Sequence, residues 1–290
     1  LSDTVAESPI PVLIRGRIHH DLHVFATRSA RTSESLIDIQ LQHRAPKCLP
    51  TLMLFNARSL NKKFNQFHAI LQTNFKDTHL IAVTETWFSE TNPASACQLP
   101  LYHLFHKDRR GQKGGGVALY VRDDMNPTEV FSDTVPPHLE ALWVRLRSSA
   151  AVHLPKDIFV GVIYSPPRSP HRAEMIEHII NMVDRARLHA TNASLIIMGD
   201  FNDLETDEIE RHTSLSQIVK EPTRESAILD KILTDLNEDF CVPQISTPIA
   251  SSDHNVVTVL PCLLPPPRKS TRTSYRPFRD SSVRAFGQWV

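Results

Sequence analysis

The sequence lacks the features that mark membrane proteins, zinc-binding proteins and disulfide-stabilised proteins. No apolar run approaches the ~18–20 residues that a transmembrane helix needs, so we expect no membrane partner. The four cysteines are never spaced as C-x-x-C, so we expect neither a zinc site nor a disulfide framework. We therefore expect the protein to work in a reducing compartment. No signal peptide and no internal repeat is visible.

The sequence also lacks net charge, because 32 basic residues balance 32 acidic ones. Residues 49–260 hold 20 basic and 26 acidic side chains, whereas residues 261–290 hold 6 basic and 1 acidic. A protein that binds nucleic acid mainly by counterion release needs a basic body. This body is acidic, so a site for a polyanion would need another source of positive potential, such as a bound divalent cation.

Composition and patterning predict one globular domain with two flanks. Hydrophobic residues make up 41% of the chain, which is enough to bury a core. Residues 1–48 show little periodic pattern and are predicted to be a poorly structured upstream segment. Residues 49–260 form the predicted domain, and residues 261–290 are a Pro-rich basic linker. The chain begins at Leu1, and we expect it to be a fragment of a longer protein.

Strands dominate the predicted domain. Helical periodicity covers 60–75, with Ser59 as the expected N-cap, and 175–186, with Ser169 before Pro170 as a start signal. The run 142–146 alternates as a half-exposed antiparallel strand would. Many strands with few helices predict packed sheets with helices outside, an α/β (α+β) fold. The predicted strands are 51–55, 80–84, 116–121, 142–146, 158–164, 195–198, 228–233 and 256–260.

Polar side chains repeatedly stand where a predicted strand begins or ends. Strand ends that meet at one rim of a sheet commonly carry sites, so we expect these side chains to gather there. The carboxylates and amides among them are hard oxygen donors of the kind that Mg²⁺ binds. The residues are Asn56, Glu85, Tyr164, Asp200, Asn202, Asp230, Asp253 and His254.

A histidine completes the chemistry that a phosphodiesterase needs. His254 can become a cation near neutral pH, and Glu85, Asp200 and Asp253 can bind a metal ion or orient water. The glycine run 114–116 lacks the Gly-Lys-Ser/Thr ending of a P-loop, and predicts a tight turn or close backbone contact before a strand.

These motifs occur in an order that resembles a known superfamily. They are FNARSL at 55–60, TETW at 84–87, GGGV at 114–117, VIY at 162–164, MGDFN at 198–202, PTR at 222–224, ILD at 228–230 and SDH at 252–254. The pattern resembles the endonuclease/exonuclease/phosphatase superfamily. In detail it is similar to the apurinic-type endonuclease domain of non-LTR (LINE-like) retrotransposons of the chicken-repeat/jockey group. The resemblance implies a four-layer, DNase I-like fold: a two-sheet β-sandwich flanked by helices.

The resemblance also implies a role for each of these residues. Asn56 and Glu85 would hold the metal, with Glu85 as the direct ligand, and Asp253 would approach it. Asp200 would orient or activate the attacking water. The implied phosphate contacts are Asn202, Tyr164 and His254, with His254 oriented by Asp230.

The sequence departs from the repair enzymes of the superfamily at two places. Arg58 stands where those enzymes have an acid, which leaves a second metal contact there in doubt. Pro166, Pro167 and Arg168 stand after Tyr164 where those enzymes have an Asn, and we expect Arg168 to replace that Asn as a phosphate contact. Further candidates to face DNA are Arg109, Arg110 and Lys113, with a solvated loop as the alternative.

The expected function is Mg²⁺-dependent hydrolysis of a DNA phosphodiester bond, with Mn²⁺ as an alternative ion. Target-site nicking for retrotransposition would follow, with a reverse transcriptase covalently linked downstream and a nuclear location inferred from the substrate. Two alternatives remain open. One is a phosphatase of small phosphoesters from the same superfamily, and the other is a catalytically inactive retrotransposon relic.

Overall fold

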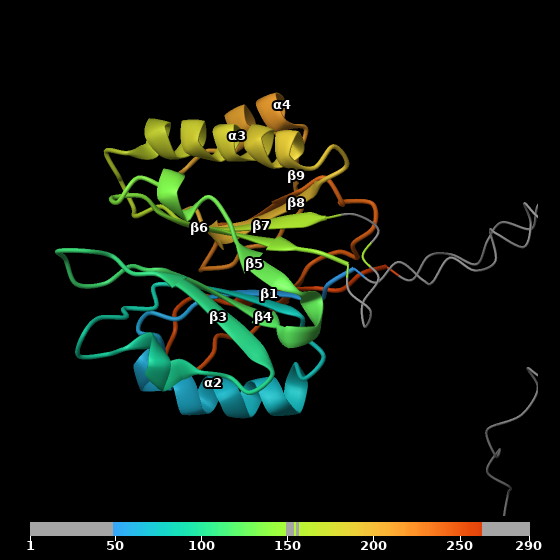
Figure 1. The fold of residues 1–290 in the computed structure, drawn as a ribbon. Coiled ribbons are helices and arrows are strands. Elements are labelled where there is room, and N and C mark those ends of the chain that lie inside the picture. The colour runs from blue at the N-terminus through green and yellow to red at the C-terminus, as the bar shows by residue number, and fades with distance from the viewer. Residues whose placement is uncertain (1–48, 149–153, 155–156, 263–290) are drawn as a thin grey trace, which may run out of the picture. The chain divides into compact units, whose positions relative to one another are not determined.

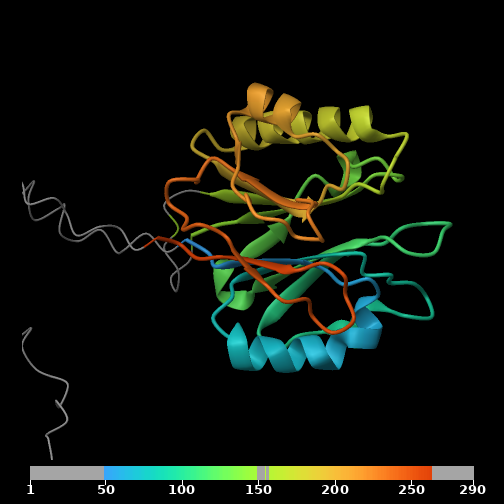
Figure 2. The same cartoon turned by 180° about the vertical axis from the view of Figure 1, so that it is seen from behind.

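Two six-stranded sheets packed face to face form the centre of the protein in a computed structural model (Figure 1). The structure describes residues 49–148, 154 and 157–262. The predicted upstream segment at 1–48 and the linker from residue 263 onward lie outside the described residues. Helices cover the outer face of each sheet, and the reverse view shows the same layers (Figure 2). The predicted four-layer DNase I-like sandwich is confirmed.

The first sheet has the order β11-β12-β1-β2-β4-β3. Strands β1 and β2 are parallel, and the other neighbours are antiparallel. A parallel pair needs a crossover, which helix α2 provides between β1 and β2. The strands are β1 (Leu52–Asn56), β2 (Leu80–Thr84), β3 (Tyr102–Lys107), β4 (Val117–Arg122), β11 (Gln244–Ser246) and β12 (Val256–Val259).

The second sheet repeats this plan with the order β5-β6-β7-β8-β10-β9. Its parallel pair is β7 and β8, joined through helix α3, and its other neighbours are antiparallel. The strands are β5 (Pro127–Glu129), β6 (Glu140–Leu146), β7 (Ile158–Tyr164), β8 (Ser194–Asp200), β9 (Ser216–Gln217) and β10 (Asp230–Thr234).

Helix α2 lies on the first sheet, and α3 and α4 lie on the second (Figure 1). Leu60, Phe67 and Leu71 are buried along one face of α2, as the period of the sequence predicts. The α-helices are α2 (Leu60–Asn74), α3 (Arg172–His189) and α4 (Asp207–Thr213). The 3₁₀ turns are η1 (Ala94–Cys97), η2 (Asp123–Met125) and η3 (Ser132–Thr134). None of the helices in the described residues has both the length and the apolar composition needed to cross a membrane.

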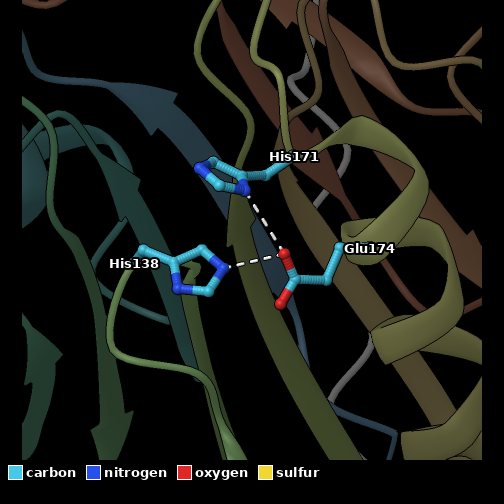
Figure 3. Close-up of side chains that lie close together, drawn as sticks. All are labelled: His138, His171 and Glu174. Carbon is cyan, nitrogen blue, oxygen red and sulfur yellow. Dashed lines mark hydrogen bonds and ion pairs between the residues drawn. The ribbon is translucent and has the colours of Figure 1, made fainter.

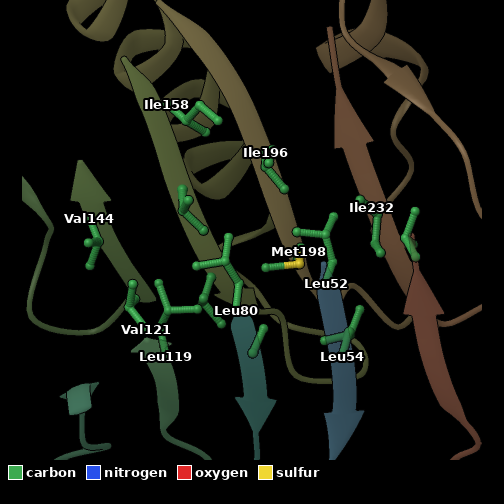
Figure 4. Packing of buried hydrophobic residues seen from close by; sticks show 14 of the residues in the cluster. Leu52, Leu54, Leu80, Leu119, Val121, Val144, Ile158, Ile196, Met198 and Ile232 are labelled. Atoms are coloured by element: carbon green, nitrogen blue, oxygen red, sulfur yellow. The ribbon is translucent and has the colours of Figure 1, made fainter. Parts of the chain in front are cut away.

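Three apolar clusters hold the layers together. The central cluster fills the space between the sheets and includes Leu54 and Leu80 from one sheet and Ile196 and Met198 from the other (Figure 4). A second cluster lies between the second sheet and α3, and a third between the first sheet and α2. Because both faces of each sheet are covered, the central strands are apolar almost throughout.

Two details of the predicted elements are wrong. Strand β6 is buried on both faces, because Trp143 packs on the α3 side and Leu142 between the sheets. Helix α3 begins at Arg172, with His171 rather than Ser169 as its N-cap. Ser59 is the N-cap of α2, as predicted, but it has a φ of 83° and makes no side-chain cap bond. The N–H of Leu60 instead donates to the carbonyl of Thr86.

The prediction also missed several short elements: β3, β5, β9, β11 and α4. Strands β5, β9 and β11 have two or three residues each, too few to show a period. In β3 no residue is fully buried, so its sequence lacks the apolar character of the central strands. The tertiary pairing partners define these strands, which explains why a local pattern did not reveal them.

Candidate active site

Strand direction brings the predicted site residues to one rim. Parallel strands β1 and β2 both end there, delivering Asn56 and Glu85 from the first sheet. In the second sheet, Asp200 at the end of β8 pairs with Tyr164 of β7 and with Asp230 of antiparallel β10. The predicted gathering of polar side chains at strand ends is therefore what the fold produces.

Asn56 links the two sheets. Its buried Nδ2 donates to Glu85 Oε1 at 3.0 Å and to Asp200 Oδ2 at 2.9 Å. Its Oδ1 accepts the backbone N–H of Arg58 at 3.0 Å. These bonds use both N–H donors of the amide and fix which end of it faces the carboxylates. Asn56 thereby sets the separation of the Glu85 and Asp200 side chains.

The hydrogen bonds that Glu85 receives from the described residues come from neutral groups. Besides Asn56, Tyr164 OH donates to its Oε1 and Trp87 Nε1 to its Oε2, each at 3.1 Å. Among the described residues no Lys or Arg forms an ion pair with this carboxylate. Glu85 has a φ of 51°, in the left-handed region, which costs conformational energy for any residue other than glycine. The Glu85 charge is thus left for another cation to offset.

His254 and Asp230 form a buried pair on the second side of the site. His254 Nδ1 donates to Asp230 Oδ2 at 2.7 Å, which directs Nε2 toward Asp200 Oδ2, 4.0 Å away. A distance of 4.0 Å is too long for a hydrogen bond, so Nε2 keeps its capacity for another partner. Burial, the largest single influence, opposes charge on the imidazole, but the hydrogen bond to Asp230 and the charges of the surrounding aspartates together raise the pKa of His254.

Asp200 is almost fully buried at the centre of the site. Burial, and then the neighbouring Asp230 charge, raise the pKa of Asp200 to about 7, although His254 and Asn56 oppose this shift. A carboxyl group with a pKa near neutral can accept and release a proton at working pH. The backbone N–H of Asn202 donates to Asp200 Oδ1 at 3.0 Å and holds the carboxylate in place.

Two of the predicted phosphate contacts, Asn202 and Tyr164, lie beside this cluster. Asn202 has a φ of 46°, and its Nδ2 donates to the carbonyl of Ser165 at 2.9 Å. Burial, and then the Glu85 charge, raise the pKa of Tyr164, so this side chain stays a neutral hydrogen-bond donor. Arg168 is exposed on the loop after β7, where its backbone N–H donates to Asp203.

Asp253 does not join the hydrogen-bonded cluster. Its Oδ2 lies 2.6 Å from Arg224 Nη2 and 3.6 Å from Arg58 Nη1. Its carboxylate is therefore neutralised by guanidinium groups, unlike Glu85. Arg58, which replaces the acid of the repair enzymes, lies on the Asp253 side of the site. The predicted approach of Asp253 to a metal ion would require Arg224 to release it, and that role stays a prediction.

The donor set fits a divalent cation that prefers oxygen. Glu85, Asp200 and Asp230 put three carboxyl groups in one site with one histidine, and Asp230 Oδ1 is buried with no hydrogen-bond partner among the described residues. Close carboxylates without cations are costly, as the raised pKa of Asp200 indicates. Hard oxygen ligands suit Mg²⁺ or Mn²⁺. Glu85 is the residue whose carboxylate could hold such an ion, whereas Asn56 presents Nδ2 to the carboxylates, and its predicted role as a direct ligand would require its Oδ1 to leave the N–H of Arg58.

The sequence reasoning missed a supporting network behind Glu85. Arg109 pairs with buried Glu140 at 2.5 Å and lies over the Tyr164 ring, 5.5 Å from its centroid. Glu140 also accepts the backbone N–H of Gly116. The glycine run makes the close backbone contact that was predicted, since a Cβ at Gly116 would collide with Thr86 Oγ1. Arg109, which the sequence offered as a candidate to face DNA, forms an ion pair with Glu140.

A comparison with protein families shows to which family the chain belongs. Residues 53–254 match the model of the Endonuclease/Exonuclease/phosphatase family. The chain belongs to this family. The match spans the rim residues from β1 to His254, so the family's shared region includes the site described above. Comparison with curated proteins by sequence gives no match.

Solved structures show the family's fold at low sequence identity. The AP endonuclease LMAP from Leishmania major has a TM-score of 0.57 and 13% identity, covering 79% of this chain and 98% of that one. The endonuclease domain of TRAS1, a telomere-specific non-LTR retrotransposon, has a TM-score of 0.51 and 16% identity, covering 75% and 100%. The 3′ phosphatase NExo from Neisseria, bound to a product DNA hairpin, has a TM-score of 0.54 and 15% identity, covering 74% and 100%.

Proposed function

We propose that this protein is a Mg²⁺-dependent DNA endonuclease, with Mn²⁺ as an alternative ion. The observation that carries the proposal is the convergence of Asn56, Glu85, Asp200 and the His254–Asp230 pair at one rim. An ion bound at Glu85 would lie beside a phosphate oxygen and offset its negative charge. Such an ion is needed because the net charge of the domain is itself negative. Members of the family typically use divalent metal ions.

The geometry supports a division of labour among the side chains. Asp200, with its near-neutral pKa, accepts a proton from the attacking water. His254 presents Nε2 to a phosphate oxygen and offsets the charge that develops there. Asp230 fixes the imidazole tautomer by accepting from Nδ1. Tyr164 and Asn202 position the phosphate, and Arg168 on the exposed loop contacts the DNA backbone.

The biological setting that we propose is a non-LTR retrotransposon of the chicken-repeat/jockey group. In this setting the domain nicks a chromosomal target site, a reverse transcriptase follows in the same polyprotein, and the protein acts in the nucleus. The motif order across residues 55–254 supports the proposal. The retrotransposon endonuclease domain among the solved structures of this fold is consistent with it.

A second candidate is a phosphatase of small phosphoesters. The family includes phosphatases, and one structure of the same fold is a 3′ phosphatase. The residues at the rim would stabilise the same pentacoordinate phosphorus with either leaving group. The open question is substrate access, which the shape of the loops around the rim determines.

The endonuclease proposal is tested by incubating the protein with supercoiled plasmid and Mg²⁺. We expect conversion to the nicked form, and a loss of about 10²–10⁴ in rate for Glu85→Ala or Asp200→Ala. Glu90→Ala is the matched control, because Glu90 is an exposed glutamate in the segment after β2 that also carries Glu85. This variant should nick the plasmid at the rate of the parent. The same preparations are assayed with inositol phosphates and with DNA that ends in a 3′ phosphate.

The outcomes separate the candidates. Faster turnover of inositol phosphates than of plasmid would replace the endonuclease with the phosphatase. No turnover of any substrate would indicate an inactive relic. Nicking that survives both site variants would show that the activity comes from a contaminant or from another site.

A further inference from the structure

A second cluster of ligating side chains lies outside the candidate active site (Figure 3). His138 stands just before strand β6, His171 is the N-cap of α3, and Glu174 lies in the first turn of α3. His138 Nε2 and His171 Nδ1 both contact Glu174 Oε2, at 2.8 and 3.3 Å. The ligating atoms of all three residues lie within 4.8 Å of one another.

The backbone around these side chains is anchored. Leu139, next to His138, and Met175, next to Glu174, are both buried in the apolar cluster between the second sheet and α3. The two imidazole rings lie with their centroids 4.4 Å apart. The three side chains therefore converge from two separate segments whose positions the core already fixes. Such preorganisation lowers the conformational cost of binding an ion.

The chemistry of the cluster fits a transition metal better than Mg²⁺. Two imidazole nitrogens with one carboxylate form a His₂Glu set, in which Zn²⁺ has bond lengths of about 2.0–2.2 Å. Tetrahedral geometry then separates the ligand atoms by about 3.3 Å, close to the present His171–Glu174 distance of 3.3 Å.

The cluster is also accessible. The three side chains are exposed by 42–45%, so an ion can enter from solvent and keep water in an open position. His138 and His171 line a hollow of about 360 Å³ that also includes Tyr164, Ser165 and Arg168. A metal ion here would join the segment before β6 to the start of α3, beside the loop that carries Arg168.

We propose that His138, His171 and Glu174 form a binding site for a divalent transition-metal ion of the zinc class. The expectation from cysteine spacing, that no zinc site exists, does not extend to histidine ligands. The site shares no ligand with the Glu85 site and differs from it in donor chemistry, although the hollow that His138 and His171 line also includes Tyr164 and Arg168. The proposal does not depend on whether the protein cleaves DNA.

The test is a titration of tag-free protein with Zn²⁺ and with Co²⁺, in the presence of excess Mg²⁺. The readouts are the number of ions bound, the visible absorption of bound Co²⁺, and the thermal unfolding temperature. We expect the double variant His138→Ala/His171→Ala to bind one ion fewer than the parent protein. Glu174→Gln should weaken binding by at least about tenfold, since even indirect support of a ligand is worth about 10–100-fold.

His68→Ala is the matched control, because His68 is a partly exposed histidine on helix α2 bonded to Gln72. This variant should keep the stoichiometry of the parent. Unchanged stoichiometry and absorption in the double variant would overturn the proposal by assigning the bound ion elsewhere. The absence of Zn²⁺ or Co²⁺ binding to the parent would also overturn it. Plasmid nicking by the same samples is scored separately and decides only the endonuclease proposal.

Discussion

At the scale of single residues, the site depends on how neighbours set the charge of buried groups. Asp200 and Asp230 are both buried, and His254 is the basic residue that lies within 4.0 Å of both among the described residues. Asp230 raises the pKa of His254 and so favours its cationic form, while burial raises the pKa of Asp200 to about 7. Near neutral pH, Asp200 can therefore both accept and release a proton beside this histidine.

The raised pKa of Asp200 predicts a pH-dependent effect on stability without metal. A folded-state pKa above the unfolded value means that the folded state binds more protons, so this group lowers stability as pH rises from about 4 to 7. Asp200→Asn removes that cost. We expect the free energy of unfolding of the variant to exceed that of the parent increasingly as pH rises, by about 2–4 kcal/mol at pH 8.

The measurement is denaturant unfolding of parent and variant in chelator between pH 4 and 8. Asp133→Asn, which changes an exposed carboxylate, is the control and should show no such trend. A difference between Asp200→Asn and parent that stays constant across this range would contradict the assignment of the proton to Asp200.

The His254–Asp230 pair predicts a shift in the pH profile of nicking. Without the Asp230 hydrogen bond and charge, burial is opposed only by the weaker effects of the Asp200 and Asp253 charges, so the pKa of His254 falls. A raised histidine pKa contributes stability that is present at low pH and lost as pH rises through it, so Asp230→Asn should lose this contribution. We expect the alkaline limb of the nicking rate to move to lower pH, with a rate loss of about 10²–10⁴ at pH 8.

Asp133→Asn is the matched control, because Asp133 is an exposed aspartate in the turn η3 and is not one of the residues of the candidate site. Its pH profile should match that of the parent. Superimposable profiles for Asp230→Asn and the parent would rule out control of His254 by Asp230.

At the scale of elements, the parallel pair β7–β8 determines where Tyr164 and Asp200 lie. Gly199 immediately precedes Asp200, and a Cβ there would collide with the backbone of Ile163. On the neighbouring strand, Gly161 leaves room for the ring of Trp143 in the same way. Glycine is required at both positions because a neighbouring strand or side chain lies too close for a Cβ, and not because the chain turns there.

Gly199→Ala should therefore force β8 away from β7. Since the obstacle is backbone and cannot rotate aside, we expect a loss of about 3 kcal/mol or more in the free energy of unfolding. Gly111→Ala is the control: space surrounds Gly111, and only its positive φ of 74° opposes a side chain. It should cost about 1–2 kcal/mol. Denaturant unfolding measures both, and equal losses would disprove the argument from close approach.

At the scale of the whole molecule, the candidate site spans the seam between the two sheets. Asn56 and Glu85 belong to the first sheet, whereas Asp200, Asp230 and Tyr164 belong to the second. The Asn56–Asp200 and Tyr164–Glu85 hydrogen bonds cross this seam. An ion held at Glu85 would thus stabilise the packing of one sheet on the other.

We predict that Mg²⁺ raises the unfolding temperature of the parent protein. At a free concentration 100 times the dissociation constant, binding should add about 2.7 kcal/mol to the free energy of unfolding. Glu85→Gln should lose most of this gain, because the ligand charge is gone. Glu90→Gln should retain it. Thermal unfolding with and without Mg²⁺ measures the effect, and an equal gain for parent and Glu85→Gln would place the ion elsewhere.

Local sequence was enough to predict the layers and the central strands. The apolar runs of β1, β2, β7 and β8 and the period of α2 are local properties, because each follows from the burial of its own side chains. The polar residues at their ends were visible for the same reason, since they interrupt apolar runs. Family motif order then supplied the expected roles of Asn56, Glu85, Asp200 and His254.

Only the tertiary structure decided which of these side chains meet. It placed Asp253 between Arg224 and Arg58, paired Glu140 with Arg109 behind the site, and brought His138 to the start of α3. Each of these contacts joins residues far apart in the chain. Their formation depends on sheet packing and loop paths, which are set by the whole core rather than by neighbouring residues, so no local pattern contains them.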